Sequence, residues 1–124
     1  MITGNKMADR FPKDADGEAL RRIARDGSDL SKPMFINFHV AVPDKPSAKK
    51  LAAIAQKLGY RIKVFASPEC VLRWTCECST RMVAAYESVI AVQNELADLS
   101  EPFGGRPDGW STFGNGPIGS PPVR

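Results

Sequence analysis

The sequence has few of the residues that carry catalysis or metal binding. Of its 124 residues, one is a histidine, His39, and three are cysteines, Cys70, Cys76 and Cys78. An odd cysteine count does not favour a disulfide scaffold and agrees with a reducing compartment. A zinc knuckle needs two residues between paired cysteines, whereas Cys76 and Cys78 are separated by one and have no second pair. We therefore expect no metal site and no cofactor.

The chain also lacks long apolar runs and catalytic motifs. No hydrophobic run approaches the span of about 20 residues that crosses a bilayer. Residues 1–7 lack the apolar core of a secretion signal, so the expected location is the cytoplasm. His39 has no serine or cysteine obviously paired with it, and Gly104-Gly105 follows a helical segment instead of opening one, unlike a phosphate-binding loop. These absences argue against an enzyme.

Charge is small in total and uneven along the chain. The length fits one domain, and a net charge of +3 does not by itself indicate nucleic-acid binding. Residues 28–66 hold seven Lys or Arg against two acids, whereas residues 67–124 hold four against seven. This pattern predicts a positive and a negative side. It suits a charged partner, and it equally suits two helices with solvated faces of opposite charge.

The first half of the chain predicts a helix, a strand and a second helix. Asp14 or Asp16 caps the first helix, which ends at Gly27. Residues 34–42 alternate between apolar and polar, as a half-buried strand does. The second helix begins at Asp44 or Lys45 and ends at Gly59. Its expected buried stripe consists of Ala48, Leu51, Ala52, Ile54, Ala55 and Leu58.

The second half predicts two strands, over residues 60–65 and 71–79, and a long helix from Arg81 to about Ser100. Cys76 and Cys78 are two apart on a strand and share a face with Trp74, so they are expected to be small buried hydrophobic residues. The order α-β-α-β-β-α predicts an α/β (α+β) fold. We expect a two-layer sandwich with a small mixed sheet that resembles the ferredoxin-like arrangement.

Residues 103–110 are rich in turn formers. Gly104-Gly105 and Pro107-Asp108-Gly109 each permit a sharp change of direction, and aromatic side chains stand at both ends of the segment. One interpretation is a clip that folds back over the edge of a small core. The other is a partner-binding loop that carries an exposed Trp110 and Arg106.

The predicted sheet has a face that is polar and partly basic. Its members are Asn37, His39, Arg61, Lys63, Phe65, Arg73, Thr75 and Glu77. Basic residues with an aromatic on an open sheet are typical of RNA-recognition folds, although those place two or more aromatics on central strands and this face has only Phe65. The alternative is a solvated face covered by the first helix or by the clip.

Several motifs of the sequence belong together as one set. Near the start these are Phe11-Pro-Lys-Asp-Ala-Asp-Gly17, Ala19-Leu-Arg-Arg22, Gly27-Ser-Asp-Leu-Ser-Lys-Pro33 and Ile36-Asn-Phe38. The set continues through residues 52–60, Trp74-Thr75, the helix of Met82 and Phe103-Gly-Gly-Arg-Pro-Asp-Gly-Trp110. Taken together, these motifs resemble the regulator of ribonuclease E activity B family. The resemblance implies a family-like domain over residues 11–113, with disordered segments at residues 1–10 and 114–124.

The resemblance implies a non-enzymatic regulator. Members of the family are small cytoplasmic α/β proteins, and the founding type binds endoribonuclease E outside its catalytic domain, lowers its activity and so alters mRNA decay. Typical members are acidic, whereas this chain has a sequence pI of 8.9. No residue roles carry over from the family.

Two charged sets are candidate partner-binding residues. The acidic helix, with Glu87, Glu95 and Asp98, is best suited to a basic protein partner such as the ribonuclease. The alternative is an RNA-binding module that uses Arg61, Lys63 and Arg73 on the sheet face.

Overall fold

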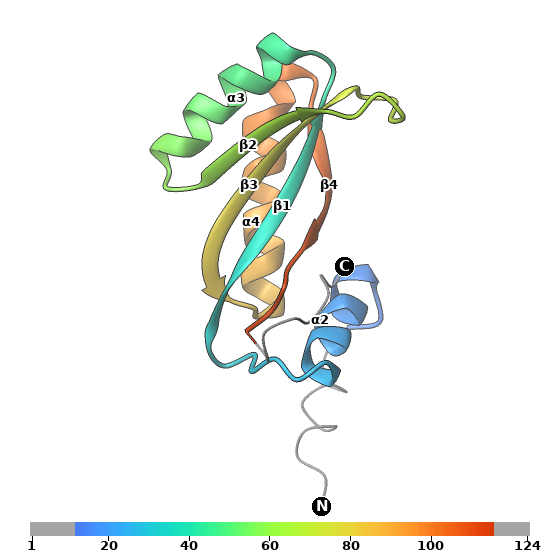
Figure 1. Ribbon diagram of the computed structural model, residues 1–124, viewed down its shortest axis with the longest axis vertical. Helices are drawn as coiled ribbons and strands as arrows, with labels where there is room; N and C mark the ends of the chain where they lie inside the picture. The colour runs from blue at the N-terminus through green and yellow to red at the C-terminus, as the bar shows by residue number, and fades with distance from the viewer. Residues whose placement is uncertain (1–11, 116–124) are drawn as a thin grey trace, which may run out of the picture. The chain divides into compact units, whose positions relative to one another are not determined.

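The computed structural model describes residues 12–115 of the chain (Figure 1). The expected disorder of residues 1–10 and 116–124 lies outside the described residues. In chain order the elements are α2 (Ala15–Arg25), β1 (Pro33–Val42), α3 (Lys45–Lys57), β2 (Arg61–Ala66), β3 (Trp74–Val83), α4 (Tyr86–Ser100), the 3-10 helix η1 (Glu101–Phe103) and β4 (Arg106–Ser111).

The four strands form one sheet in the order β2-β3-β1-β4. Strands β2 and β3 pair antiparallel, with Arg61 opposite Ser79 and Ala66 opposite Trp74. The predicted α+β two-layer class is confirmed. The sheet is antiparallel and not mixed, because β3 inserts between β1 and β2, so the strands that α3 connects are not neighbours. The expected resemblance of the whole sheet-and-helix arrangement to the ferredoxin-like fold stays a prediction.

The predicted clip does fold back against the edge of the core, but its second half is a strand and not a series of turns. β4 pairs beside β1 and forms an edge of the sheet. Pro107 and Gly109 are acceptable there, since an edge strand tolerates a missing N–H and a positive φ, which is 89° at Gly109. A Cβ on Gly105 would lie 2.7 Å from Val42 Cγ1. The turn formers therefore allow a close approach of two chain segments.

The start of the last helix was also predicted too early. β3 begins at Trp74 and continues to Val83, and α4 begins only at Tyr86. Thr80 and Val83 are β-branched and fit a pleated strand, so strand pairing prevails over the helical spacing that extends back to Arg81.

The buried stripe of α3 is narrower than expected. Ala48, Leu51 and Ala55 are fully buried, but Ile54 is 38% exposed and Leu58 is 53% exposed. The helix packs along β2, which is a short edge strand. A six-residue strand at the edge covers only part of the apolar side of a longer helix.

The chain divides into two compact units. In the described part, the first comprises residues 12–36, 81–91 and 111–115, and the second comprises residues 37–80 and 92–110. Within residues 12–115, no helix has the length and apolar character needed to cross a membrane.

In the first unit, α2 is fixed at its beginning by Asp14. The Asp14 Oδ1 atom accepts a hydrogen bond of 2.8 Å from the backbone N–H of Gly17, which confirms Asp14 as the cap. Its other carboxylate oxygen accepts a 2.5 Å hydrogen bond from the hydroxyl of Tyr86. Leu20 and Ile23 are fully buried. One carboxylate therefore connects the start of α2 to the start of α4.

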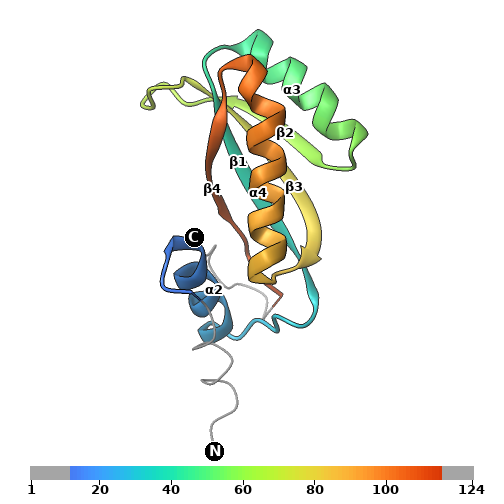
Figure 2. The same cartoon turned by 180° about the vertical axis from the view of Figure 1, so that it is seen from behind.

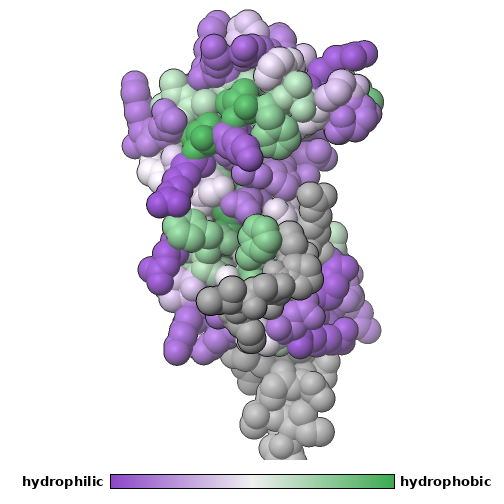
Figure 3. Space-filling model, viewed as in Figure 1, coloured by the Kyte–Doolittle hydropathy of each residue, from purple (hydrophilic) through white to green (hydrophobic). Residues whose placement is uncertain are grey.

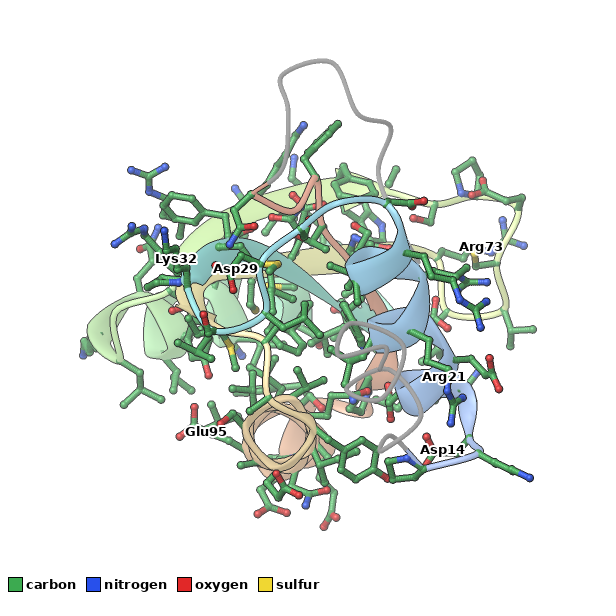
Figure 4. The ribbon with its side chains drawn as sticks, turned by 90° about the horizontal axis from the view of Figure 1, so that it is seen from below. Asp14, Arg21, Asp29, Lys32, Arg73 and Glu95 are labelled. Atoms are coloured by element: carbon green, nitrogen blue, oxygen red, sulfur yellow. The ribbon has the colours of Figure 1, made fainter. Side chains whose placement is uncertain are left out.

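A second set of hydrogen bonds in this unit holds the loop before β1, whose Asp29 and Lys32 are labelled in Figure 4. The side-chain amide of Asn115 donates to the backbone carbonyls of Asp29 and Lys32 at 2.9 and 3.2 Å. The backbone N–H of Asp29 donates to the Asn115 side-chain oxygen at 2.7 Å. Residue 115, placed at the start of the expected tail, thus binds a loop far away in the sequence.

In the second unit, residues 92–100 of α4 lie behind the sheet in Figure 1 and in front of it in Figure 2, so they cover one face. Phe38, Val40, Cys76, Cys78 and Leu96 are buried between these layers. Trp110 of β4 is also buried, with its ring centroid 6.5 Å from that of Phe38. The expectation of a buried cysteine pair is confirmed, and the burial of Trp110 favours the fold-back clip over a loop with an exposed Trp110.

Candidate functional site

The acidic set lies on α4. Glu95 and Asp98 are both exposed in the second unit, and their spacing of three residues places them on one side of the helix. Glu87 is exposed in the first turn of α4, in the part of the helix that belongs to the first unit. Figure 4 shows Glu95 beside α4. None of the large exposed hydrophobic side chains among the described residues comes from α4, so the surface it offers is polar.

Glu95 is held in place by Tyr60. The hydroxyl of Tyr60, just before β2, donates a hydrogen bond of 2.7 Å to Glu95 Oε1. Burial and this hydrogen bond raise the pKa of Tyr60 above its ordinary value of 10.0, so the phenol stays neutral and remains a donor at neutral pH. The carboxylate is therefore held in a fixed position on the exposed side of α4.

The basic set lies on the sheet, on the side that alternates with the buried side chains. We call this side the open face, defined by Asn37, His39, Arg61, Lys63, Phe65, Thr75, Glu77 and Ser79. Arg61 and Lys63 are exposed on it, opposite Ser79 and Glu77 of β3. Arg73 is exposed but precedes β3 and belongs to the loop, so the expected position of Arg73 on the strand is wrong. The structure brings two of the three basic residues together.

The polar side chains of the open face bond largely to one another. His39 Nε2 lies 3.1 Å from Glu77 Oε1, and Ser79 donates a 2.6 Å hydrogen bond to Asn37. The view from the side away from α4 shows hydrophobic side chains in more than one place on this face, with hydrophilic ones between and around them (Figure 3). On the strands of this face in the second unit, the exposed aromatic is Phe65, at 37%. Phe35 of β1, two residues before Asn37, is 42% exposed as well, so the strands carry more than one exposed aromatic ring of the kind on which single-stranded RNA stacks.

The two charged sets do not form one site. In Figure 4 the side chains of Arg73 and Glu95 project from opposite sides of the second unit. Arg61 and Lys63 belong to the open face, and α4 covers the other face of the sheet. Any partner that contacts Glu95 and Asp98 therefore approaches the molecule from a different side than one that contacts Arg61 and Lys63.

The candidate nucleophiles, the cysteines, have other hydrogen-bond partners than His39. Cys76 and Cys78 are fully buried with their sulfur atoms 3.9 Å apart, and the hydrogen bond to Cys76 together with burial raises the pKa of the Cys78 thiol. Cys70 is exposed in the loop before β3. Among residues 12–115, no three His, Cys, Asp or Glu side chains are grouped closely enough to hold a metal ion. His39 contacts Glu77, whose Oε1 lies 3.1 Å from His39 Nε2.

Sequence reasoning missed one exposed surface. Ile54 and Leu58 were expected in the core, yet both are exposed beside the exposed Lys50 and Lys57. One signal for this lies in the sequence. Leu58 immediately precedes Gly59, whose φ of 100° ends the helix, so Leu58 falls at the fraying end, where burial is least complete.

Comparisons of the sequence with a family model and with known proteins lead to the same family. The sequence model of the family described as "Regulator of ribonuclease activity B" matches residues 13–112. A protein of that name from Xenorhabdus nematophila is 28% identical over 97 residues, which cover 76% of this chain and 69% of the relative. One from Haemophilus ducreyi is 27% identical over 99 residues, covering 77% of this chain and 69% of the relative.

Proposed function

Because the chain belongs to the regulator of ribonuclease activity B family, we propose that it regulates an endoribonuclease E-like enzyme by binding it directly and lowering its activity. The chain itself acts without catalysis, and it works in the cytoplasm, where it modulates mRNA decay. The partner is the ribonuclease protein and not a small molecule. The motifs at both ends of the domain support membership of the family, and the proposal adds the partner to it.

The observation that carries this proposal is the exposed acid pair Glu95 and Asp98. Two carboxylates three residues apart on a helix with a polar surface are suited to a cluster of Lys or Arg on a partner. Tyr60 fixes Glu95, which reduces the side-chain entropy that would be lost when a partner binds. We place the contact at this pair, and Glu87 in the first turn of α4 is a separate candidate.

A pull-down of purified endoribonuclease E tests the contact. Glu95→Lys/Asp98→Lys should abolish retention of the ribonuclease, because two attractive contacts become repulsive. Glu69→Lys changes an exposed acid in the loop between β2 and β3 and should leave retention unchanged. Glu87→Lys, assayed alone, shows whether the contact extends to the start of α4. Unchanged retention by the double variant would remove the contact from Glu95 and Asp98.

A second candidate function is RNA binding through the open face, which is favoured by the exposed Arg61 and Lys63 next to Phe65. Replacing Arg61, Lys63 and Arg73 with Ala should then weaken binding of a single-stranded RNA, and the affinity of the unmodified chain should fall steeply with salt. Absence of RNA binding at low salt would eliminate this candidate while leaving the ribonuclease contact intact.

A further inference from the structure

One side of α3 combines positive charge with exposed apolar groups. Lys50, Ile54, Lys57 and Leu58 follow one another at i, i+4, i+7 and i+8, which places them on one side of the helix and its C-terminal cap. All four are exposed, and Ile54 and Leu58 are 38% and 53% exposed. We call these four residues the α3 stripe. All four belong to the second unit.

The charged residues of the segment that carries the stripe have one sign. From residue 45 to residue 63 the chain holds six basic residues and no acidic one. They are Lys45, Lys49, Lys50, Lys57, Arg61 and Lys63. A helix on a solvated surface usually mixes signs and forms pairs between residues three or four apart, which α3 cannot do without acids of its own. Lys50 and Lys57 therefore flank the apolar side chains of the stripe with positive charge.

We propose that the α3 stripe docks an acidic helical segment of a protein partner, a segment that carries Glu or Asp around two or more leucine-like side chains. Carboxylates on such a segment pair with Lys50 and Lys57, and its apolar side chains cover Ile54 and Leu58. This is a second surface, separate from Glu95 and Asp98, and it has the opposite charge preference. It goes beyond the proposed ribonuclease contact and does not depend on it.

Other occupants fit the stripe less well. A second copy of the chain could offer α4, but among the described residues that helix has no large exposed hydrophobic side chain to cover Ile54 and Leu58. Single-stranded RNA binds by stacking its bases on aromatic rings, whereas the stripe is aliphatic. The chain's own ends are also poor candidates by composition, since residues 1–11 contain one acid and residues 116–124 contain none.

Fluorescence anisotropy with a labelled peptide tests the proposal. The probe has about 18 residues, enough to form a helix, with Leu at i, i+3 and i+4 positions and Glu elsewhere. Ile54→Ser/Leu58→Ser should weaken its binding at least about tenfold, and so should Lys50→Glu/Lys57→Glu. Two controls should bind as the unmodified chain does. They are Lys49→Glu, about 100° around the helix from Lys50, and Val71→Ser, a hydrophobic residue 88% exposed in a loop.

Matched probes decide between occupants. A peptide with Ser in place of Leu should bind at least about tenfold more weakly than the probe, since it keeps the charge and loses the apolar contact. No saturable binding of the Leu-containing probe, or equal losses in Lys49→Glu and Lys50→Glu/Lys57→Glu, would overturn the proposal. It would also be overturned if only a single-stranded RNA bound in a stripe-dependent way, or if the stripe variants abolished self-association in sedimentation velocity instead of peptide binding.

Discussion

The hydroxyl of Tyr60 lies 2.7 Å from Glu95 Oε1 and donates a hydrogen bond to it. The bond connects the segment that enters β2 with α4, so the same carboxylate serves the fold and the proposed contact. A regulator that recognises a larger protein gains from such an arrangement, because a side chain that is already ordered loses less entropy on binding.

Tyr60→Phe removes this bond and should lower the free energy of unfolding by about 1 kcal/mol, the usual value for one hydrogen bond, or less because the pair is partly exposed. The pKa of Tyr60 is raised above 10.0 in the folded state, so its stabilisation is complete below pH 10 and is lost as pH rises further. Urea unfolding between pH 8 and about 11 measures both effects. A Tyr60→Phe variant with the same alkaline loss as the unmodified chain would contradict this assignment.

Asp14 should make the chain sensitive to acid. Hydrogen bonds from the Tyr86 hydroxyl and then from the Gly17 N–H hold the pKa of the Asp14 carboxyl below its ordinary value of 3.8. A lowered pKa stabilises the folded state above pH 3.8, and that stabilisation is lost as pH falls below it. Tyr86→Phe should reduce the loss of thermal stability between about pH 5 and pH 2. An identical acid profile in both proteins would show that the bond does not matter.

Gly105→Ala should destabilise the junction between η1 and β4. The new methyl carbon would lie 2.7 Å from Val42 Cγ1 and 2.9 Å from the carbonyl oxygen of Ala41, closer than van der Waals contact. Overpacking of this kind costs about 1–3 kcal/mol, and the shift in the urea midpoint measures it. Asn94→Ala, at an exposed position of α4, serves as the control and should leave the midpoint nearly unchanged. A midpoint for Gly105→Ala equal to that control would mean that β4 does not approach β1 so closely.

The three cysteines should differ in reactivity. Cys70 is exposed, whereas Cys76 and Cys78 are buried. A thiol reagent such as Ellman's reagent should therefore react rapidly with one group in the folded protein and with all three of the sequence after denaturation. Cys70→Ser should leave no rapid reaction in the folded state. Rapid reaction of three groups without denaturant would place the cysteine pair outside the core.

Local patterns in the sequence predicted the first part of the fold well. The alternation from Met34 to Val42 fits only a strand with one buried side, and the structure contains this strand as β1. Asp44 followed by Pro46 gives a helix start with a cap and a preset first turn, and Asp44 does accept the N–H of Ser47 at 2.8 Å. In both cases the information lies within a few consecutive residues.

The errors arose where distant residues decide the structure. Pro107 and Gly109 resemble a turn until β1 is known to lie alongside, since only an edge strand tolerates both. Ile54 matches the apolar period of its helix, but its burial depends on how far β2 extends beneath it. The candidate site shows the same limit. The charges of Glu95 and Lys63 were evident, while the Tyr60 hydrogen bond and the antiparallel pairing that position them were not.

The central claim, direct regulation of a ribonuclease, is tested most directly by the cleavage rate of a defined RNA by purified endoribonuclease E as the chain is added. We predict a saturable fall in the rate. Glu95→Lys/Asp98→Lys should need at least about ten times more protein for the same effect, while Glu69→Lys should act as the unmodified chain does. A cleavage rate that stays constant at every concentration of the chain would contradict the account.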